Sequence, residues 1–103
     1  MNSWRRGSTP TNTFNVNVDL TDATVYVTYS QKGQVILEKT NANMTINSDS
    51  IVVELTQEDT LKFSTGDVEV QIRYVKRDGT ADASNIITVS STRILKDGLI
   101  SYV

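Results

Sequence analysis

Carboxylates are the reactive side chains that this sequence supplies in number, and two pairs of them have spacings that allow a chemical interpretation. Glu58 and Asp59 are adjacent, and Asp78 and Asp82 lie on either side of Gly79. A glycosidase needs two acids facing each other about 5–10 Å apart, whereas adjacent acids at the start of a helical turn complement the helix dipole. A calcium loop ends on a bidentate glutamate, which the second pair lacks. We therefore expect neither a catalytic pair nor a metal site.

Two residue types that carry much of protein chemistry are absent. The 103 residues include no histidine and no cysteine. Zinc sites built from these residues and nucleophilic triads that need an imidazole are therefore excluded, and no disulfide can form. The five glycines are isolated and do not form the cluster that cradles phosphate. The sequence thus predicts a protein that is not an enzyme and uses no cofactor.

The charge balance bears on the class of partner. The net charge is −2, so the chain has no polybasic field that would attract nucleic acid or anionic lipid. No apolar run approaches the roughly 20 residues that span a bilayer. The segment after Arg5 and Arg6 lacks the apolar core of a secretory signal. We expect no nucleic-acid partner, no membrane association and no export by a signal peptide.

Alternation of apolar and polar residues is the dominant pattern, and it is typical of half-buried strands, whose successive side chains point to opposite faces. It is clearest in residues 67–77. Tight turns are predicted at Lys32–Gly33 and Asp78–Gly79. Thr56, three positions before Asp59, resembles a capping box and predicts one helical turn at 56–61, with Leu61 and Phe63 closing the core. The other predicted strands are residues 14–20, 24–31, 34–39, 51–55 and 85–91.

The number and spacing of these elements indicate the fold class. About seven short strands, separated by turns at roughly 8–12-residue intervals, are typical of a sandwich or a barrel. We predict an all-β chain with a single immunoglobulin-like β-sandwich of antiparallel strands at residues 13–103. A small open β-barrel is the alternative. Residues 1–12 are predicted to form an extended N-terminal arm.

Residues at both ends of the sequence are candidates for binding a partner. Tryptophan and arginine are enriched at interface hot spots and occur together in the arm. The tryptophan could instead fold back to cover one end of the sandwich. The apolar segment Leu99–Val103 could form a last edge strand, which we favour, or pair with a neighbouring subunit by strand addition. The predicted partner-binding residues are Trp4, Arg5, Arg6, Leu99, Ile100 and Tyr102.

Several sequence segments together resemble a known group of proteins. They read, in order, RRGSTPTNTF, VDLTDATVYVTYSQKGQVILEK, VVELTQEDTLKF, GDVEVQIRYVKRDGTADASN and ILKDGLI. From about Arg5 to Ile100, the chain resembles small β-sandwich proteins encoded among the structural genes of phages and prophages of Gram-positive, mainly clostridial, bacteria. It is also similar in pattern to the N-terminal domain of phage baseplate upper proteins. The resemblance implies no catalytic residues.

The functional expectation follows from this resemblance and from the absence of a predicted catalytic or metal site. It is a non-enzymatic phage or prophage structural protein, a tail or baseplate component that binds other phage structural proteins or itself as a homo-oligomer. Its expected location is the virion, or the host cytoplasm during assembly. The alternative is a carbohydrate- or other ligand-binding module, since four tyrosines and one tryptophan are available for stacking. The alternation turns Tyr29 and Tyr74 inward, which leaves few rings for a binding platform.

Overall fold

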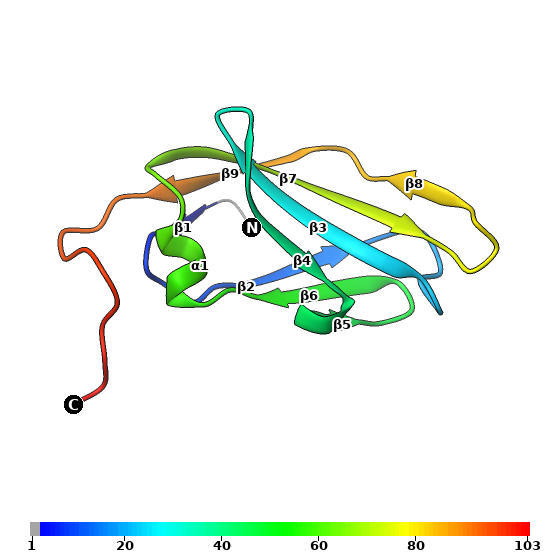
Figure 1. The fold of residues 1–103 in the computed structure, drawn as a ribbon, viewed down its shortest axis with the longest axis horizontal. Helices are drawn as coiled ribbons and strands as arrows, with labels where there is room; N and C mark the ends of the chain where they lie inside the picture. The colour runs from blue at the N-terminus through cyan, green and yellow to red at the C-terminus, as the bar shows by residue number, and fades with distance from the viewer. Residues whose placement is uncertain (1–2) are drawn as a thin grey trace.

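The computed structural model describes residues 3–103, which contain nine strands and two short helices. The helices are the 3₁₀ turn η1 (Asn41–Asn43) and α1 (Gln57–Leu61). The strands are β1 (Ser3–Arg5), β2 (Thr11–Asn15), β3 (Thr24–Gln31), β4 (Gln34–Thr40), β5 (Thr45–Ile46), β6 (Ser50–Glu54), β7 (Gly66–Val75), β8 (Ala81–Ala83) and β9 (Ile87–Thr92). They form two sheets, with α1 at one end and β8 near the other (Figure 1).

The strand order is that of an immunoglobulin-like sandwich. The larger sheet runs β1-β9-β7-β3-β4, with β8 paired to β7, and the smaller sheet runs β2-β6-β5. The run β9-β7-β3-β4 corresponds to strands G, F, C and C′ of the immunoglobulin scheme, and β2-β6-β5 to strands B, E and D. The predicted sandwich is confirmed, and the two sheets do not join into the barrel that was the alternative. One strand pair is parallel rather than antiparallel. In it, β1 runs in the same direction as β9, with Trp4 opposite Ser91.

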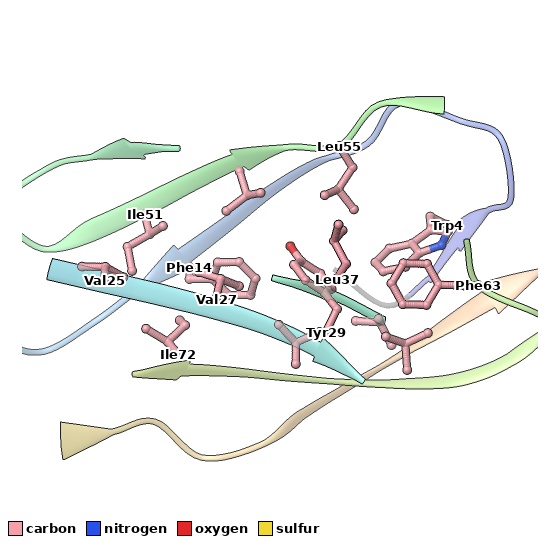
Figure 2. Close-up of a cluster of buried hydrophobic side chains, with 14 of the residues drawn as sticks. Trp4, Phe14, Val25, Val27, Tyr29, Leu37, Ile51, Leu55, Phe63 and Ile72 are labelled. Carbon is pink, nitrogen blue, oxygen red and sulfur yellow. The ribbon is translucent and has the colours of Figure 1, made fainter. Parts of the chain in front are cut away.

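The core lies between the two sheets and follows from the alternation in the sequence (Figure 2). Val25, Val27 and Tyr29 of β3 point inward and are fully buried, while Tyr26 between them is exposed. The register places Val27 opposite Ile72 of β7. Because each sheet hides one face and exposes the other, a shift of one residue would turn these side chains outward. The apolar pattern therefore fixes how the strands are paired.

The turn chemistry appears where the sequence predicts it. Lys32 and Gly33 both have positive φ, at 54° and 78°, as a two-residue hairpin that matches the twist of its strands requires. Thr56 caps α1, since its hydroxyl accepts the Asp59 N–H at 3.1 Å and the Asp59 carboxylate accepts the Thr56 N–H at 3.0 Å. Phe63 is buried at the end of the core as predicted, whereas Leu61 is only half-buried and is not part of the core cluster.

The first predicted strand is displaced along the sequence. We expected residues 14–20, and β2 spans Thr11–Asn15. Beyond it, the backbone N–H of Thr21 donates to the Asp19 carboxylate at 2.9 Å, and Asp22 has a φ of 61°. Local side-chain hydrogen bonds of this kind compete with strand pairing and bend the chain before the alternating pattern ends.

The predicted N-terminal arm, residues 1–12, is wrong for its described part, because residues 3–12 belong to the sandwich. β1 pairs with β9, and β2 begins at Thr11; Met1 and Asn2 lie outside the described residues. The predicted last edge strand in Leu99–Val103 is also wrong, because that segment has no strand pairing. The place beside β9 where it could have extended the larger sheet is taken by β1.

Candidate functional site

Trp4 is a core residue and not an exposed binding residue. Its exposed fraction is 4 %, and its ring centroid lies 5.4 Å from Phe63 and 6.0 Å from Tyr29 (Figure 2). An edge-to-face aromatic pair contributes about 0.5–1.5 kcal/mol beyond its buried area. The expectation that Trp4 binds a partner is therefore wrong. The alternative, that it folds back to cover one end of the sandwich, is confirmed.

Arg6 is committed to contacts within the chain. Its Nε donates to the carbonyl of Phe63 at 2.6 Å, and one terminal nitrogen donates to the carbonyl of Leu61 at 3.2 Å. The other lies 3.3 Å from the Asp97 carboxylate. A basic side chain near the end of a helix can donate hydrogen bonds to the last backbone carbonyls of that helix. Arg5 is exposed and makes one bond, to the carbonyl of Arg93 at 3.2 Å, so it remains accessible.

The tail, residues 93–103, lies outside the core. Leu99 and Ile100 are 65 % and 56 % exposed, and Tyr102 is fully exposed. The tail is nevertheless held in place, because the Gln57 amide donates to the carbonyl of Ile100 at 3.1 Å and accepts its N–H at 2.9 Å. Gln57 thus pairs with Ile100 as a residue of a neighbouring strand would.

A hollow of about 760 Å³ lies where the tail approaches the sandwich. It is bounded by the start of β2, the end of β6, the start of α1 and the tail. The structure therefore brings Leu99 next to α1 but leaves Trp4 and Arg6 outside this hollow. The lining residues are Thr9, Thr11, Glu54, Leu55, Thr56, Gln57, Glu58 and Leu99.

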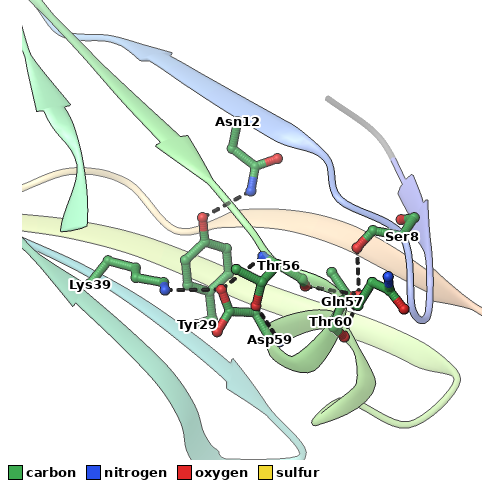
Figure 3. Close-up of polar contacts among 8 residues, drawn as sticks. All are labelled: Ser8, Asn12, Tyr29, Lys39, Thr56, Gln57, Asp59 and Thr60. Carbon is green, nitrogen blue, oxygen red and sulfur yellow. Dashed lines mark hydrogen bonds and ion pairs between the residues drawn. The ribbon is translucent and has the colours of Figure 1, made fainter. Parts of the chain in front are cut away.

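Two polar contacts near α1 join separate elements of the sandwich, one linking α1 to β4 and the other linking the two sheets (Figure 3). Lys39 of β4 pairs with the Asp59 carboxylate at 2.9 Å, and Asn12 of β2 donates to the Tyr29 hydroxyl at 2.9 Å. Burial would raise the pKa of Asp59, but hydrogen bonds from Thr56 and the Lys39 ammonium outweigh it and leave this pKa below its usual value.

The pKa of the Tyr29 hydroxyl is shifted in the opposite direction, above its usual value. Burial raises the pKa of Tyr29 to about 12, and the nearby Asp59 charge adds to this rise, against the hydrogen bond from Asn12. Tyr29 is therefore neutral at physiological pH, while Asp59 is a paired carboxylate. Both groups have the surroundings of a structural network, with each charge matched by a partner.

Sequence reasoning missed Gln57. It sits inside a capping box, and its contact with Ile100 spans 43 residues of sequence. A glutamine at this position is a common helix residue, so its type and spacing give no signal of a long-range role. The apolar character of Leu99–Val103 was the usable signal, but we interpreted it as a last edge strand, which the structure does not contain.

The rest of residues 3–103 offers few other sites. A second hollow, of about 490 Å³, lies at the end of the sandwich away from α1, with Tyr74 and Asp82 among its lining residues. Within the described residues, no group of three or more acidic, histidine or cysteine side chains gathers where a metal ion could bind. No helix in that part of the chain has the length and apolar character needed to cross a membrane.

Comparisons with known proteins give one distant structural likeness. No protein-family model matches the chain, and no curated protein matches it in sequence. Among solved structures, the V domain of amphioxus IgVJ-C2 is similar, with a TM-score of 0.36 and 10 % sequence identity, over 87 % of this chain and 98 % of that chain. A likeness this weak carries no argument about function. The assignment of an immunoglobulin-like sandwich rests on the strand order.

Proposed function

We propose that this chain is a non-enzymatic structural protein of a phage or prophage, a tail or baseplate component that works by binding other proteins of the particle or further copies of itself. The observation that carries the proposal is the tail. Large apolar side chains stand in solvent there, at Leu95, Leu99, Ile100, Tyr102 and Val103.

Exposed apolar groups in one segment favour a binding role. Burying apolar surface is favourable by about 25 cal/mol per Å², and clustered exposed apolar residues are typical of binding surfaces. Two contacts fix the tail before any partner arrives, namely Gln57 with Ile100 and Arg6 with Asp97. A segment that is already held loses less conformational freedom on binding. The phage setting is supported by the sequence resemblance.

The proposal is tested on particles from the strain that encodes the chain. After induction, particles are purified on a density gradient and their proteins are identified by mass spectrometry. We expect the chain in the particle fraction, at a constant ratio to the other particle proteins across the gradient. An abundant host enzyme serves as the control for contamination. Absence of the chain from intact particles would contradict the proposal.

A carbohydrate- or ligand-binding role is the second candidate, favoured by the hollow away from α1. Half-buried Tyr74 lies there beside Asn15, Asp82 and Asn85. A ring with a few convergent polar groups is a common way to hold a small polar ligand. However, Trp4 and Tyr29 are buried, so a broad aromatic platform is not available. A glycan array on which the purified chain gives no signal would remove this candidate.

A further inference from the structure

We propose that the free edge of β2, residues Thr11–Asn15, accepts the segment Leu99–Val103 of a second copy of this chain as an added strand. The inference rests on the proposed function, since it names the partner and the contact through which copies of a structural protein would join. It assigns an acceptor surface on the smaller sheet and a donor segment in the tail.

The acceptor is a row of backbone groups that face away from β6. The N–H of Leu55 donates to the carbonyl of Pro10, and the N–H of Val16 donates to the carbonyl of Asp49. In an antiparallel pair, alternate residues point their backbone groups toward and away from the partner. Even-numbered residues of this segment therefore face β6. Those of Thr11, Thr13 and Asn15 face outward, where no described residue pairs with them.

This edge carries none of the features that block strand addition. Natural edge strands are protected by charge, proline, bulges or short length. β4 has a bulge at Ile36 and charged residues at Glu38 and Lys39, while β1 and β5 are only three and two residues long. By contrast, β2 has five residues, and residues 7–18 contain no charged side chain. Pro10 does not interrupt the edge, because its backbone faces β6.

The donor segment presents a matching set of groups. Gln57 binds the N–H and the carbonyl of Ile100. In an extended segment, the residues on either side of Ile100 point their backbone groups the opposite way. Leu99, Ser101 and Val103 then offer three sets of backbone groups to the three of β2. Residues 98–103 contain no charged side chain, so like charges do not oppose the pairing.

A second copy fits this contact better than the chain's own β2 does. Ile100 is held at α1, and the tail runs from there away from both sheets, whereas β2 runs toward the other end (Figure 1). The tail in this position does not pair with its own β2, which leaves that edge open to the tail of a neighbour.

The test removes the central N–H on each side of the contact. Thr13→Pro blocks the acceptor without loss of a hydrogen bond to β6, and Ser101→Pro blocks the donor. Thr13→Val and Ser101→Ala are the matched controls, since both keep the N–H. In sedimentation velocity we expect the unaltered chain and both controls to associate as concentration rises, and each proline variant alone to remain a monomer.

Mixing the two proline variants gives the decisive measurement. Thr13→Pro keeps its donor segment and Ser101→Pro keeps its acceptor edge, so an equimolar mixture should form a dimer of one of each and nothing larger. Circular dichroism checks that both variants are folded. If Thr13→Pro does not fold, Thr13→Lys takes its place, because an added charge protects an edge.

Three outcomes would overturn the inference. They are an unaltered chain that is monomeric at every concentration, an oligomer that persists in both blocking variants, and a mixture that does not pair. These results are separate from the proposed function. A monomer that is found in purified particles would leave that function standing with another partner, whereas a strand-paired oligomer that is absent from particles would remove it.

Discussion

The guanidinium of Arg6 holds three oxygen atoms that belong to two separate segments of the chain. Two are the carbonyl oxygens of Leu61, the last residue of α1, and of Phe63 just after it, and the third is on Asp97 in the tail. Arginine suits this role because its planar donors can bind several oxygens at once. Arg6 therefore couples the position of the tail to the end of α1.

Arg6→Ala is expected to lower the free energy of unfolding by about 2 kcal/mol, because hydrogen bonds to a charged group contribute about 1.5–3 kcal/mol. Urea denaturation measures the loss. Arg5→Ala is the matched control, since its exposed side chain makes a single bond and should change the stability by no more than about 0.5 kcal/mol. Equal losses in the two variants would mean that the contacts of Arg6 with α1 and the tail do not stabilise the fold.

The ion pair of Lys39 with Asp59 should make stability depend on acid pH. The folded pKa of Asp59 lies below the ordinary 3.8, so its stabilising contribution is fully present above the unfolded value and is lost as pH falls through the folded one. At pH 7, Asp59→Asn is expected to cost about 2 kcal/mol, and the gap to the unaltered chain should close as the pH falls below the folded pKa of Asp59.

Urea titrations at several pH values measure this gap. Asp19 and Asp78 also have lowered pKa values, from hydrogen bonds with Thr21 and Thr80. They are present in both proteins, so their contributions cancel in the difference. Glu58→Gln removes a neighbouring exposed carboxylate that makes no ion pair within residues 3–103, and it should change the stability by no more than about 0.5 kcal/mol. A gap for Asp59→Asn that stays constant with pH would contradict the assignment.

At the scale of elements, β1 shows what local sequence cannot reveal. Its three residues pair with Ser90–Thr92, nearly the whole chain away, and three residues are too few to display a period. Strands β3 and β4 could be predicted, because alternation and the Lys32–Gly33 turn are local features. Tryptophan is a residue type enriched at interfaces, and this suggested a binding role for Trp4. The sequence could not show that Phe63 and Tyr29 already cover its ring.

The tail illustrates the same limit. Its apolar residues predicted a last edge strand, which was incorrect. Whether an apolar segment joins a sheet depends on whether an edge is free, and β1 occupies the one beside β9. The free edge of β2 could not be recognised before the pairing was known, since the β2 sequence looks the same at an edge as in the middle of a sheet.

A chain that starts at Thr11 is expected to be less stable by at least about 3 kcal/mol, because loss of a buried tryptophan alone costs about 3–5 kcal/mol and the Arg6 contacts are lost with it. Thermal unfolding measures the effect. A chain that ends at Asp97 is the control, since it loses mostly exposed side chains and should unfold near the temperature of the full chain. An unchanged unfolding temperature for the first variant would show that β1 is dispensable.

At the scale of the whole molecule, the proposed donor and acceptor are different surfaces. The donor leaves the α1 end, and the acceptor runs along one edge of the smaller sheet (Figure 1). A contact between unlike surfaces leaves one free donor and one free acceptor on every pair. Repeated contacts of this kind close into a ring or continue as a filament.

Paired cysteines give a covalent record of this arrangement, because the chain has none of its own. A variant with both Thr13→Cys and Ser101→Cys is expected to form a ladder of disulfide-linked species on a non-reducing gel. In the control, Leu95→Cys replaces Ser101→Cys, and the ladder should be much weaker because residue 95 lies outside the donor segment. Ladders of equal strength would indicate random collision.

The parallel pairing of β1 with β9 has a mechanical consequence. Tension between the two ends of the described chain pulls β1 from its first residue and β9 from its last. Because the two strands run parallel, this load slides them lengthwise past each other, so that their hydrogen bonds are strained together and not one after another. Trp4, packed against Phe63, opposes the same movement. A load applied to the two ends of the described chain should therefore be resisted by the whole β1–β9 pair at once.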